Sequence, residues 1–440
     1  MELLNHIPAI LKIFLVLFII VSAIKLKIPL SFSLIIGCIS LAVFFQMPIN
    51  NFFKATLDGL VSFDTISLVM IVVGILILSN AMSVSGRLNR IVDSFKLLVG
   101  ESRISLITFP ALIGLLPMPG GAIFSAPMVG TASENLDIDP QHKTIINYWF
   151  RHIWEYWLPL YPGVILALSL SELPILKFIM LNSPMTIVSL IIGYFVILHH
   201  ITLTDKIHRN YSKENIFSFI KNLTPILIVI LSLLFLGIIV NLIENILSIN
   251  SKLIIKILEK MPIFIGLIAS IMYVFITDKI NTDHLKTIFG KKGIFELGLI
   301  VIAIMIFRSI LENSGGVEQI KSDLTAYHIP LLGIIILLPF VAGLLTGIAV
   351  GFVGTSFPVV IALIQSMNTP QEEIGRLIFI AFVFGYLGMM LSPVHLCLLL
   401  TKDYFEANLI KTYYRYLIPV CIITALSALL LFSIYNYFNL

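Results

Sequence analysis

The sequence predicts an all-α polytopic membrane protein with about ten transmembrane helices in two inverted repeats of five. Composition, the spacing of apolar runs and a repeated Pro/Gly pattern predict this fold. Of the 440 residues, 58% are hydrophobic and only 12% are charged, about half the charged share of a soluble domain. The mean hydropathy is +1.04. Such a chain has too little charge to cover a soluble surface, so we interpret its long apolar runs as membrane spans.

Composition also excludes several other classes. The net charge is only +4 and the basic residues are scattered, so no nucleic-acid partner is expected. Cys38, Cys397 and Cys421 lie in apolar runs without a CxxC pattern, which indicates core or lipid-facing residues and not a disulfide or zinc framework. The chain has no HExxH or GxSxG motif and no paired intramembrane carboxylates, so we expect no enzyme and no cofactor beyond a coupling ion.

Ten apolar runs are long enough to cross about 30 Å of hydrocarbon. They are 8–23, 28–46, 62–82, 149–170, 177–198, 223–247, 261–277, 294–312, 376–400 and 416–437. The polar stretch 199–222 divides them, so we expect a first repeat over 1–198, a cytoplasmic linker over 199–222 and a second repeat over 223–440. With both termini outside, 19 of the 28 Lys and Arg residues become cytoplasmic. This predicts a multi-pass protein of a prokaryotic plasma (inner) membrane. The segment 248–260 holds three Lys on the outer side and is interpreted as an interfacial amphipathic helix.

The two halves share a pattern of breaking residues. Ser85-Gly86, Pro110 and Gly114 recur 229 positions later as Ser314-Gly315, Pro339 and Gly343. Pro127 and Pro162 are 35 residues apart, as are Pro358 and Pro393. Each half has five spans, an odd number, so the second copy must enter the membrane upside down, as in many secondary transporters.

Two further apolar regions, 104–133 and 329–367, are interrupted by Gly and Pro, and we expect each to form a re-entrant hairpin. Pro and Gly open the backbone, and open backbone must be buried in protein or line a wet cavity. Its carbonyls can hold Na⁺ and its free N–H groups attract anions. The predicted substrate-binding residues in the hairpins are Pro119, Gly120, Gly121, Ser125, Gly351, Gly354, Thr355 and Ser356, with Na⁺ candidates at Gly120, Ser125, Gly354 and Thr355. The alternative is a pair of kinks used only for helix packing.

A second pair of breaks follows the hairpins. Residues 157–163 interrupt the fourth span, and residues 385–393 interrupt the ninth. These breaks place a discontinuous helix beside each hairpin, which is the arrangement expected of a mid-membrane binding site.

Few ionisable side chains fall inside the spans. Burying a charge in the membrane is energetically unfavourable, so each of these residues is a candidate for a structural or functional role. Arg151, His152 and Glu155 lie in the fourth span, where they form either a helix-anchoring ion pair or a gate or proton relay. His395 follows the ninth-span break and is either a hydrogen-bonded core residue or a proton-coupling group. Arg308 either pairs with Glu312 or provides a counter-charge for an anionic substrate and is counted with the substrate-binding candidates. The three Trp residues form either an aromatic belt or a vestibule wall.

Three stretches resemble a known family: FPALIGLLPMPGGAIFSAPMV (109–129), NYWFRHIWEYWLPLYPGVILA (147–167) and GYLGMMLSPVHLCLLLTKDYF (385–405). They look like domain-of-unknown-function family 401, prokaryotic membrane proteins placed in the ion transporter superfamily, and the similarity runs through most of the chain. That superfamily includes carriers of dicarboxylates, citrate, gluconate and arsenite. The resemblance implies two inverted repeats of five spans plus a hairpin, and often a homodimer.

One motif departs from the superfamily pattern. Its dicarboxylate carriers have Ser-Asn-Thr signatures at the hairpin tips, whereas this chain has Gly120-Gly121 with Ser125 and Gly354-Thr355-Ser356. The resemblance therefore leaves the substrate and the coupling ion open.

These observations predict a secondary active transporter of a small organic anion, coupled to Na⁺ or H⁺ and working by alternating access in a lipid bilayer. The alternative is a passive anion channel or facilitator on the same scaffold.

Overall fold

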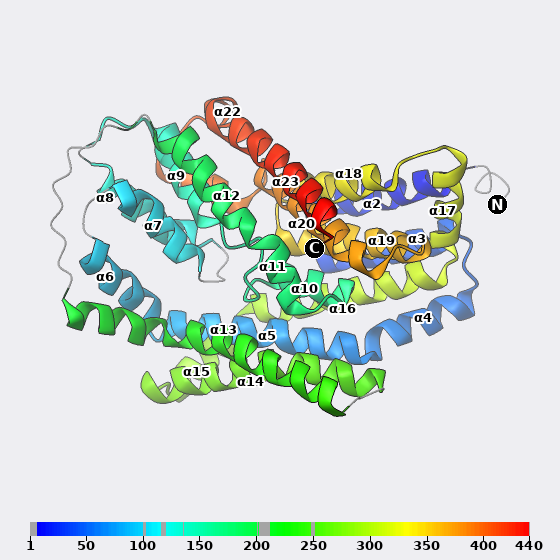
Figure 1. Ribbon diagram of the computed structural model, residues 1–440, viewed down its shortest axis with the longest axis horizontal. Coiled ribbons are helices and arrows are strands. Elements are labelled where there is room, and N and C mark those ends of the chain that lie inside the picture. Colours follow the sequence, from blue (N-terminus) through cyan, green and yellow to red (C-terminus); the bar gives the residue numbers. More distant parts are fainter. Residues whose placement is uncertain are drawn as a thin grey trace.

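The computed structural model describes residues 7–99, 103–115, 120–134, 136–199, 201, 212–247 and 251–439, and within these ranges all regular secondary structure is helical (Figure 1). This confirms the all-α class. The first half contains α2 (Ala9–Lys25), α3 (Leu30–Phe44), α4 (Ile49–Val61), α5 (Phe63–Val84), α6 (Arg87–Val99), α7 (Arg103–Gly114), α8 (Ala122–Ala132), α9 (Pro140–Arg151), α10 (Pro162–Ser171), α11 (Ile175–Asn182), α12 (Pro184–Ile192) and the π-helical η1 (Gly193–Leu198).

The second half is also helical. It contains α13 (Lys213–Leu247), α14 (Lys252–Thr277), α15 (Thr282–Phe289), α16 (Lys292–Asn313), α17 (Gly316–Ala326), α18 (Leu331–Thr346), α19 (Ala349–Ser366), α20 (Gln371–Met390), α21 (Leu396–Tyr404), α22 (Leu409–Thr412), the π-helical η2 (Tyr413–Leu417) and α23 (Ile418–Phe438).

Eight helices in the described part of the chain are long and apolar enough to cross a membrane. They are Phe63–Val84, Ile175–Leu198, Lys213–Glu244, Leu253–Thr277, Thr282–Asn313, Ala349–Ser366, Gln371–Met390 and Leu409–Phe438. The chain is therefore a multi-pass membrane protein. Eight is fewer than the ten predicted spans: the first half has two of them where five were predicted, and the second half has six where five were predicted. The additional one is α19 (Ala349–Ser366), which was expected as one arm of a re-entrant hairpin and is itself long enough to cross a membrane. The helices α2 and α3 have only 17 and 15 residues, because Pro29 and Pro48 limit them, and the run 149–170 is split between α9 and α10.

Two predicted polar segments are helical over much of their described part. The helix α13 begins at Lys213 and runs for 35 residues, so it includes the last part of the expected linker 199–222, of which residues 200 and 202–211 lie outside the described residues. The helix α14 begins at Lys252, so most of the expected interfacial segment is its first part. Pro225 and Pro262 lie inside these helices without ending them. The two helices are joined at the prolines, since Ser232 Oγ donates to Pro262 O at 2.6 Å and Ser270 Oγ donates to Pro225 O at 2.7 Å.

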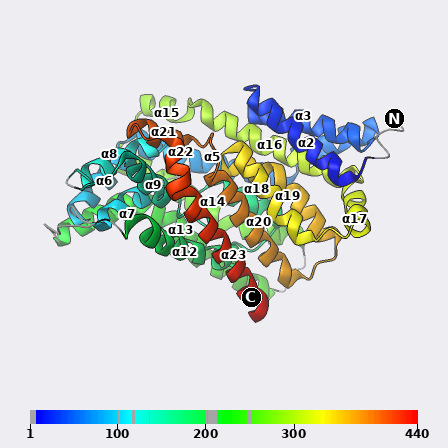
Figure 2. The ribbon, with the colours of Figure 1, turned by 90° about the horizontal axis from the view of Figure 1, so that it is seen from above.

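Helix pairs from one half pack on the other half. The pair α2 and α3 lies against α16 and α17, while the pair α13 and α14 lies against α5 and α6. Figure 1 shows α5, α13 and α14 side by side, and Figure 2 shows α2 and α3 beside α16. The interior is formed by α10, α19 and α20, most of whose residues are buried.

Glycines set the closest helix contacts. A Cβ atom at Gly343 of α18 would lie 2.2 Å from the carbonyl oxygen of Gly385 in α20, and one at Gly114 of α7 would lie 2.0 Å from the carbonyl oxygen of Arg151 in α9. Small residues allow such close backbone approach between helices in membranes.

Candidate functional site

Three interruptions of helix meet in the interior of the described chain. They are 152–161 between α9 and α10, 347–348 between α18 and α19, and 391–395 between α20 and α21. A further interruption separates α7 from α8, and its residues 116–119 lie outside the described part of the chain. A Cβ atom at Gly347 would lie 2.9 Å from Ser392 Oγ and 3.1 Å from His395 N. A Cβ atom at Gly163, at the start of α10, would lie 2.6 Å from Ala349 Cβ at the start of α19. The interruptions of the two halves are therefore in contact.

The sequence explains where each interruption falls. Pro162 occupies the first turn of α10, where its missing N–H group costs nothing. Gly120 and Gly347 have φ angles of +70° and +67°, a left-handed conformation that glycine adopts without the steric penalty of a side chain. The second hairpin differs from expectation, because its turn lies at Gly347 and Ile348 and α19 continues through Gly354.

Tyrosine hydroxyls satisfy the carbonyls that the interruptions expose. Tyr161 donates to Gly114 O at the end of α7, and Tyr386 donates to His152 O at the end of α9 at 3.1 Å. At the end of α20, Tyr148 donates to Met390 O at 2.9 Å and Tyr413 to Leu391 O at 3.0 Å. Carbonyls at three helix ends thus already have donors, which leaves less opened backbone for Na⁺ than the sequence suggested.

A buried polar cluster lies where α9 ends and α21 begins. It contains Arg151, His152, Glu155, His395 and Cys397, each less than a tenth exposed. His152 Nε2 lies 3.2 Å from His395 Nε2 and 3.8 Å from Glu155 Oε1. The structure therefore brings the four predicted coupling residues of the two halves into one cluster, and it adds a cysteine.

The predicted hairpin hydroxyls are buried and bonded within their own helices. Thr355 Oγ1 donates to Gly351 O at 2.8 Å, and Ser356 Oγ donates to Phe352 O at 2.6 Å. Ser125 lies in the first turn of α8, just after Gly120 and Gly121, with its hydroxyl 3.5 Å from Ala122 O. Pro119 lies outside the described residues. The first-hairpin candidates thus remain at a chain interruption, whereas Gly354, Thr355 and Ser356 are on a continuous helix.

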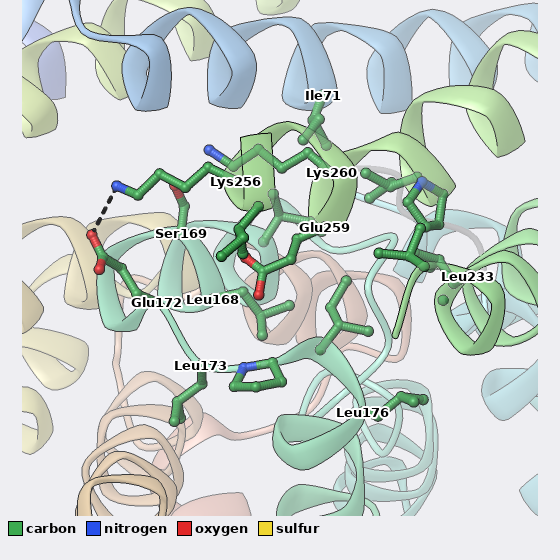
Figure 3. A pocket seen from close by; sticks show the side chains of 18 of the residues that line it. Ile71, Leu168, Ser169, Glu172, Leu173, Leu176, Leu233, Lys256, Glu259 and Lys260 are labelled. Atoms are coloured by element: carbon green, nitrogen blue, oxygen red, sulfur yellow. Dashed lines mark hydrogen bonds and ion pairs between the residues drawn. The ribbon is translucent and has the colours of Figure 1, made fainter. Parts of the chain in front are cut away.

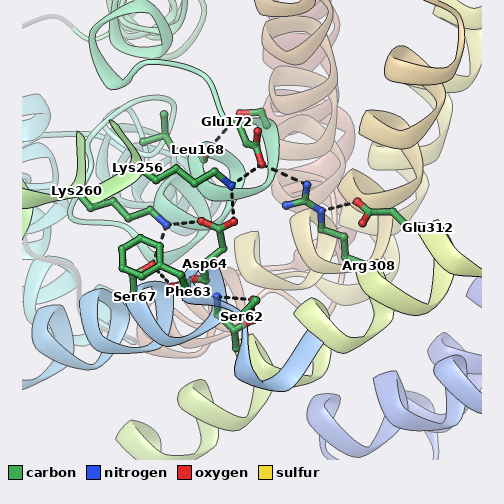
Figure 4. Close-up of polar contacts among 12 residues, drawn as sticks. Ser62, Phe63, Asp64, Ser67, Leu168, Glu172, Lys256, Lys260, Arg308 and Glu312 are labelled. Atoms are coloured by element: carbon green, nitrogen blue, oxygen red, sulfur yellow. Dashed lines mark hydrogen bonds and ion pairs between the residues drawn. The ribbon is translucent and has the colours of Figure 1, made fainter. Parts of the chain in front are cut away.

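Arg308 belongs to a separate network, the Asp64 charge cluster, made of Asp64, Glu172, Lys256, Lys260, Arg308 and Glu312 (Figure 4). Asp64 accepts from Lys256 at 2.7 Å and from Lys260 at 2.8 Å. Arg308 Nε donates to Glu312 at 2.8 Å, and Glu172 lies between Lys256 and Arg308. The cluster contains equal numbers of acids and bases, so the charge of Arg308 is balanced within the protein. It ties α5 and the end of α10 to α14 and α16.

A cavity of about 400 Å³ adjoins this cluster, between α5, α10, α11, α13 and α14. Its wall is mainly aliphatic, including Leu168, Leu173 and Leu233, with Glu172, Lys256 and Glu259 as polar groups (Figure 3). None of the described hairpin candidates lines it. This cavity is therefore separate from the buried polar cluster.

The three Trp residues act as internal hydrogen-bond donors. Trp149 Nε1 donates to Ser189 O at 2.9 Å, Trp154 Nε1 to Ala111 O at 2.8 Å and Trp157 Nε1 to Thr186 Oγ1 at 2.9 Å. These bonds hold α9 and the segment 152–161 against α7 and α12. Trp149 is buried and therefore belongs to no aromatic belt. For the partly buried Trp154 and Trp157, the belt and the vestibule wall both stay predictions.

The chain matches a family described as Protein of unknown function (DUF401), over residues 10–434. The chain belongs to this family. No curated protein matches it. The DUF401 match includes nearly all of both halves, so the helix interruptions and the buried polar cluster lie within the family's shared region.

Sequence reasoning about this DUF401 chain missed several residues of the site. The sequence predicts Cys397 only as a core or lipid-facing residue, and it does not single out the tyrosines that donate to helix ends. Cys397 could have been grouped with His395, because the two are only two residues apart in the chain. The tyrosines had no local signal, because Tyr148 and Tyr386 contact backbone more than 200 residues away.

Proposed function

We propose that the protein is a secondary active transporter of a small organic anion, coupled to Na⁺ or H⁺, working by alternating access. The observation that carries this proposal is that the helix interruptions at 152–161, 347–348 and 391–395 meet beside one buried polar cluster. Interrupted helices provide free N–H groups and carbonyls at depths where lipid-facing backbone cannot be open.

We infer that the two halves are inverted repeats, because their helices pack in exchangeable pairs. The contact of α3 with α16 corresponds to that of α14 with α5, and the contact of α7 with α9 to that of α18 with α20. Likewise, α8 packs on α21 as α19 packs on α10. The helices α7 and α8 have only 12 and 11 residues, fewer than the ~20 needed to span a bilayer, which supports a re-entrant first hairpin.

The substrate site proposed here lies between the N-termini of α8 and α19. Gly120, Gly121 and Ser125 mark the first, and Gly351 lies in the first turn of the second. A helix N-terminus attracts anions through its free N–H groups, and Arg151, buried at the end of α9, adds a positive charge to the interior. Tyrosine hydroxyls already donate to carbonyls at three helix ends, so fewer backbone oxygens are free to bind Na⁺. The buried cluster, in contrast, holds the titratable side chains His152, His395 and Glu155. We therefore favour H⁺ over Na⁺ as the coupling ion.

Uptake by purified protein in liposomes tests the proposal. A thermal-shift screen of organic anions, with and without Na⁺ and at two pH values, first selects a ligand that raises stability. We then expect saturable counterflow of that ligand, accelerated by an imposed proton gradient. Ser125→Ala should slow counterflow, whereas Ser433→Ala, an exposed serine on α23, should not.

Single-channel conductance without counterflow would contradict the transporter and support a passive channel or facilitator. An absence of both, in protein that remains folded, would contradict a transport function.

A further inference from the structure

We propose that His152, His395 and Cys397 form a binding site for a transition-metal ion that accepts imidazole and thiolate ligands, such as Zn²⁺. The possible ligand atoms of the three residues all lie within 4.8 Å of one another, and all three residues are buried. His152 comes from the end of α9 in the first half, and the other two come from the start of α21 in the second. The inference rests on these side chains and not on the transport proposal. With an ion bound by His152 and His395, proton coupling in that proposal falls to Glu155.

Hydrogen bonds to the backbone fix the tautomer of both histidines. His152 Nδ1 lies 2.6 Å from Tyr148 O, and His395 Nδ1 lies 3.3 Å from Met389 O. A carbonyl only accepts, so each Nδ1 carries the proton and each neutral ring has a lone pair on Nε2. Metal-binding histidines usually have this arrangement, with the second nitrogen donating to a carbonyl or carboxylate.

The two Nε2 atoms are close enough to bind one ion. The nitrogens are 3.2 Å apart, and two neutral acceptors at this distance repel unless a cation lies between or beside them. Two imidazole nitrogens bound to a tetrahedral zinc ion at about 2.0–2.1 Å would be roughly 3.3 Å apart. The observed separation therefore fits two ligands of one ion.

Aromatic packing holds the rings in this position. Tyr148 contacts both imidazoles edge-on, with ring centroids 4.9 Å from His152 and 5.2 Å from His395. The Tyr148 hydroxyl is itself fixed by Met390 O. The histidine ligands are thus preorganised before an ion enters, which reduces the cost of ordering them on binding.

Cys397 completes a ligand set that selects a borderline or soft metal. It is the second residue of α21, and a helix N-terminus favours the thiolate form that binds metals. Binding exchanges the thiol proton for the metal, and the proton leaves to solvent. Imidazole with thiolate suits zinc-class ions better than Na⁺, Mg²⁺ or Ca²⁺, which prefer oxygen ligands.

Three protein ligands leave a fourth coordination position open. Glu155 is an acidic side chain beside the site, with its Oε1 atom 3.8 Å from His152 Nε2. A fourth position that is not occupied by an obligatory ligand is typical of zinc sites that exchange water or another small ligand.

Cobalt substitution tests the site directly. Protein purified in detergent through a tag without histidine is titrated with Co²⁺ after EDTA treatment. We expect an intense thiolate-to-cobalt absorption in the near ultraviolet and visible bands of tetrahedral Co²⁺, both removed by one equivalent of Zn²⁺. Cys397→Ser should abolish the near-ultraviolet band, and His395→Gln should weaken binding at least tenfold. Cys421→Ser is the matched control: that cysteine is equally buried, belongs to no His/Cys group in the described chain, and its loss should leave the spectrum unchanged.

X-ray absorption of the zinc-loaded wild-type protein makes the test independent of variant folding. The expected first shell has one sulfur at about 2.3 Å and nitrogen at about 2.0–2.1 Å. A shell of oxygen and nitrogen alone, a cobalt spectrum that survives in Cys397→Ser, or no Co²⁺ or Zn²⁺ binding by folded wild-type protein would overturn the metal site. The last result would assign the histidine pair to a shared proton and would leave the transport proposal standing.

Discussion

The hydroxyl of Tyr386 on α20 donates a hydrogen bond to the backbone carbonyl of His152 at 3.1 Å, across 234 residues of chain. The carbonyl is at the end of α9, where the helix leaves its last acceptors without intrahelical donors. The bond therefore connects an interruption in one half of the protein to a helix of the other half.

Replacing this tyrosine should destabilise the protein. Tyr386→Phe removes the donor and leaves a buried carbonyl without it, which costs about 1–3 kcal/mol. We expect a lower Tm in detergent and a disturbed His152 environment. Tyr437→Phe is the control, because Tyr437 is 82% exposed and should change Tm little. Equal Tm values for Tyr386→Phe and the wild type would contradict a structural role for the hydrogen bond.

The close contact between α18 and α20 should tolerate no added methyl group. In Gly343→Ala the new Cβ atom would lie 2.2 Å from Gly385 O and 2.6 Å from Met389 N, both backbone atoms. The helices must separate, and such overpacking costs about 1–3 kcal/mol or more. Gly237→Ala on α13 is the control, since nothing lies within 4 Å of its Cβ position; alanine should there stabilise the helix by roughly 0.5–1 kcal/mol. Thermal unfolding of both variants measures the two changes, and we expect Tm to fall for Gly343→Ala and to rise for Gly237→Ala. An unchanged Tm for Gly343→Ala would show that α18 and α20 are not in this contact.

The Asp64 charge cluster should stabilise the folded protein, and the Asp64 carboxylate should be required for this stabilisation. Asp64→Asn removes the partner shared by Lys256 and Lys260, whose side chains are 35% and 19% exposed. We expect a loss of about 1–3 kcal/mol, because a partly buried charge keeps its desolvation cost without its partner. Asp403→Asn removes an acid from an exposed pair, with Asp403 66% exposed, and should cost less than about 1 kcal/mol. Similar Tm shifts in the two variants would argue against a stabilising cluster.

A second ion pair should make stability depend on pH. Burial of the Asp278 carboxyl raises its pKa, but hydrogen bonds and charge from Arg87, with further charge from Arg90, outweigh this and hold the pKa below its usual value. A folded-state pKa below the unfolded one gives stability that is complete above the unfolded value of about 3.9 and is lost as the pH falls through the folded pKa. The Tm difference between wild type and Asp278→Asn should therefore be constant from pH 7 to 5 and shrink below about pH 4. A constant difference down to pH 3 would contradict the predicted shift.

Local patterns in the sequence determined the class of this protein and the positions of most chain interruptions. Hydropathy depends on residues that are neighbours in the chain, so it was enough to predict a membrane protein. It did not predict that α9 and α10 are separate helices or that α14 is continuous from Lys252. Pro and Gly act on their own turn of backbone, so they located the interruptions near Gly120 and Pro162. The second interrupted region, predicted over 329–367, contains its turn at Gly347, whereas Gly354 and Pro358, which were expected at the opened backbone, fit within α19.

Only the tertiary structure decided which of these residues meet. His152 and His395 are 243 residues apart, yet their Nε2 atoms are 3.2 Å apart, and Asp64 finds its lysines nearly 200 residues away. Such pairings depend on how α9 packs on α21 and α5 on α14, and no periodicity in either segment encodes its partner. The same packing joined Cys397 to the two histidines and supplied tyrosines to the exposed carbonyls. The sequence thus indicated where the backbone opens, and the fold determined which side chains fill those openings.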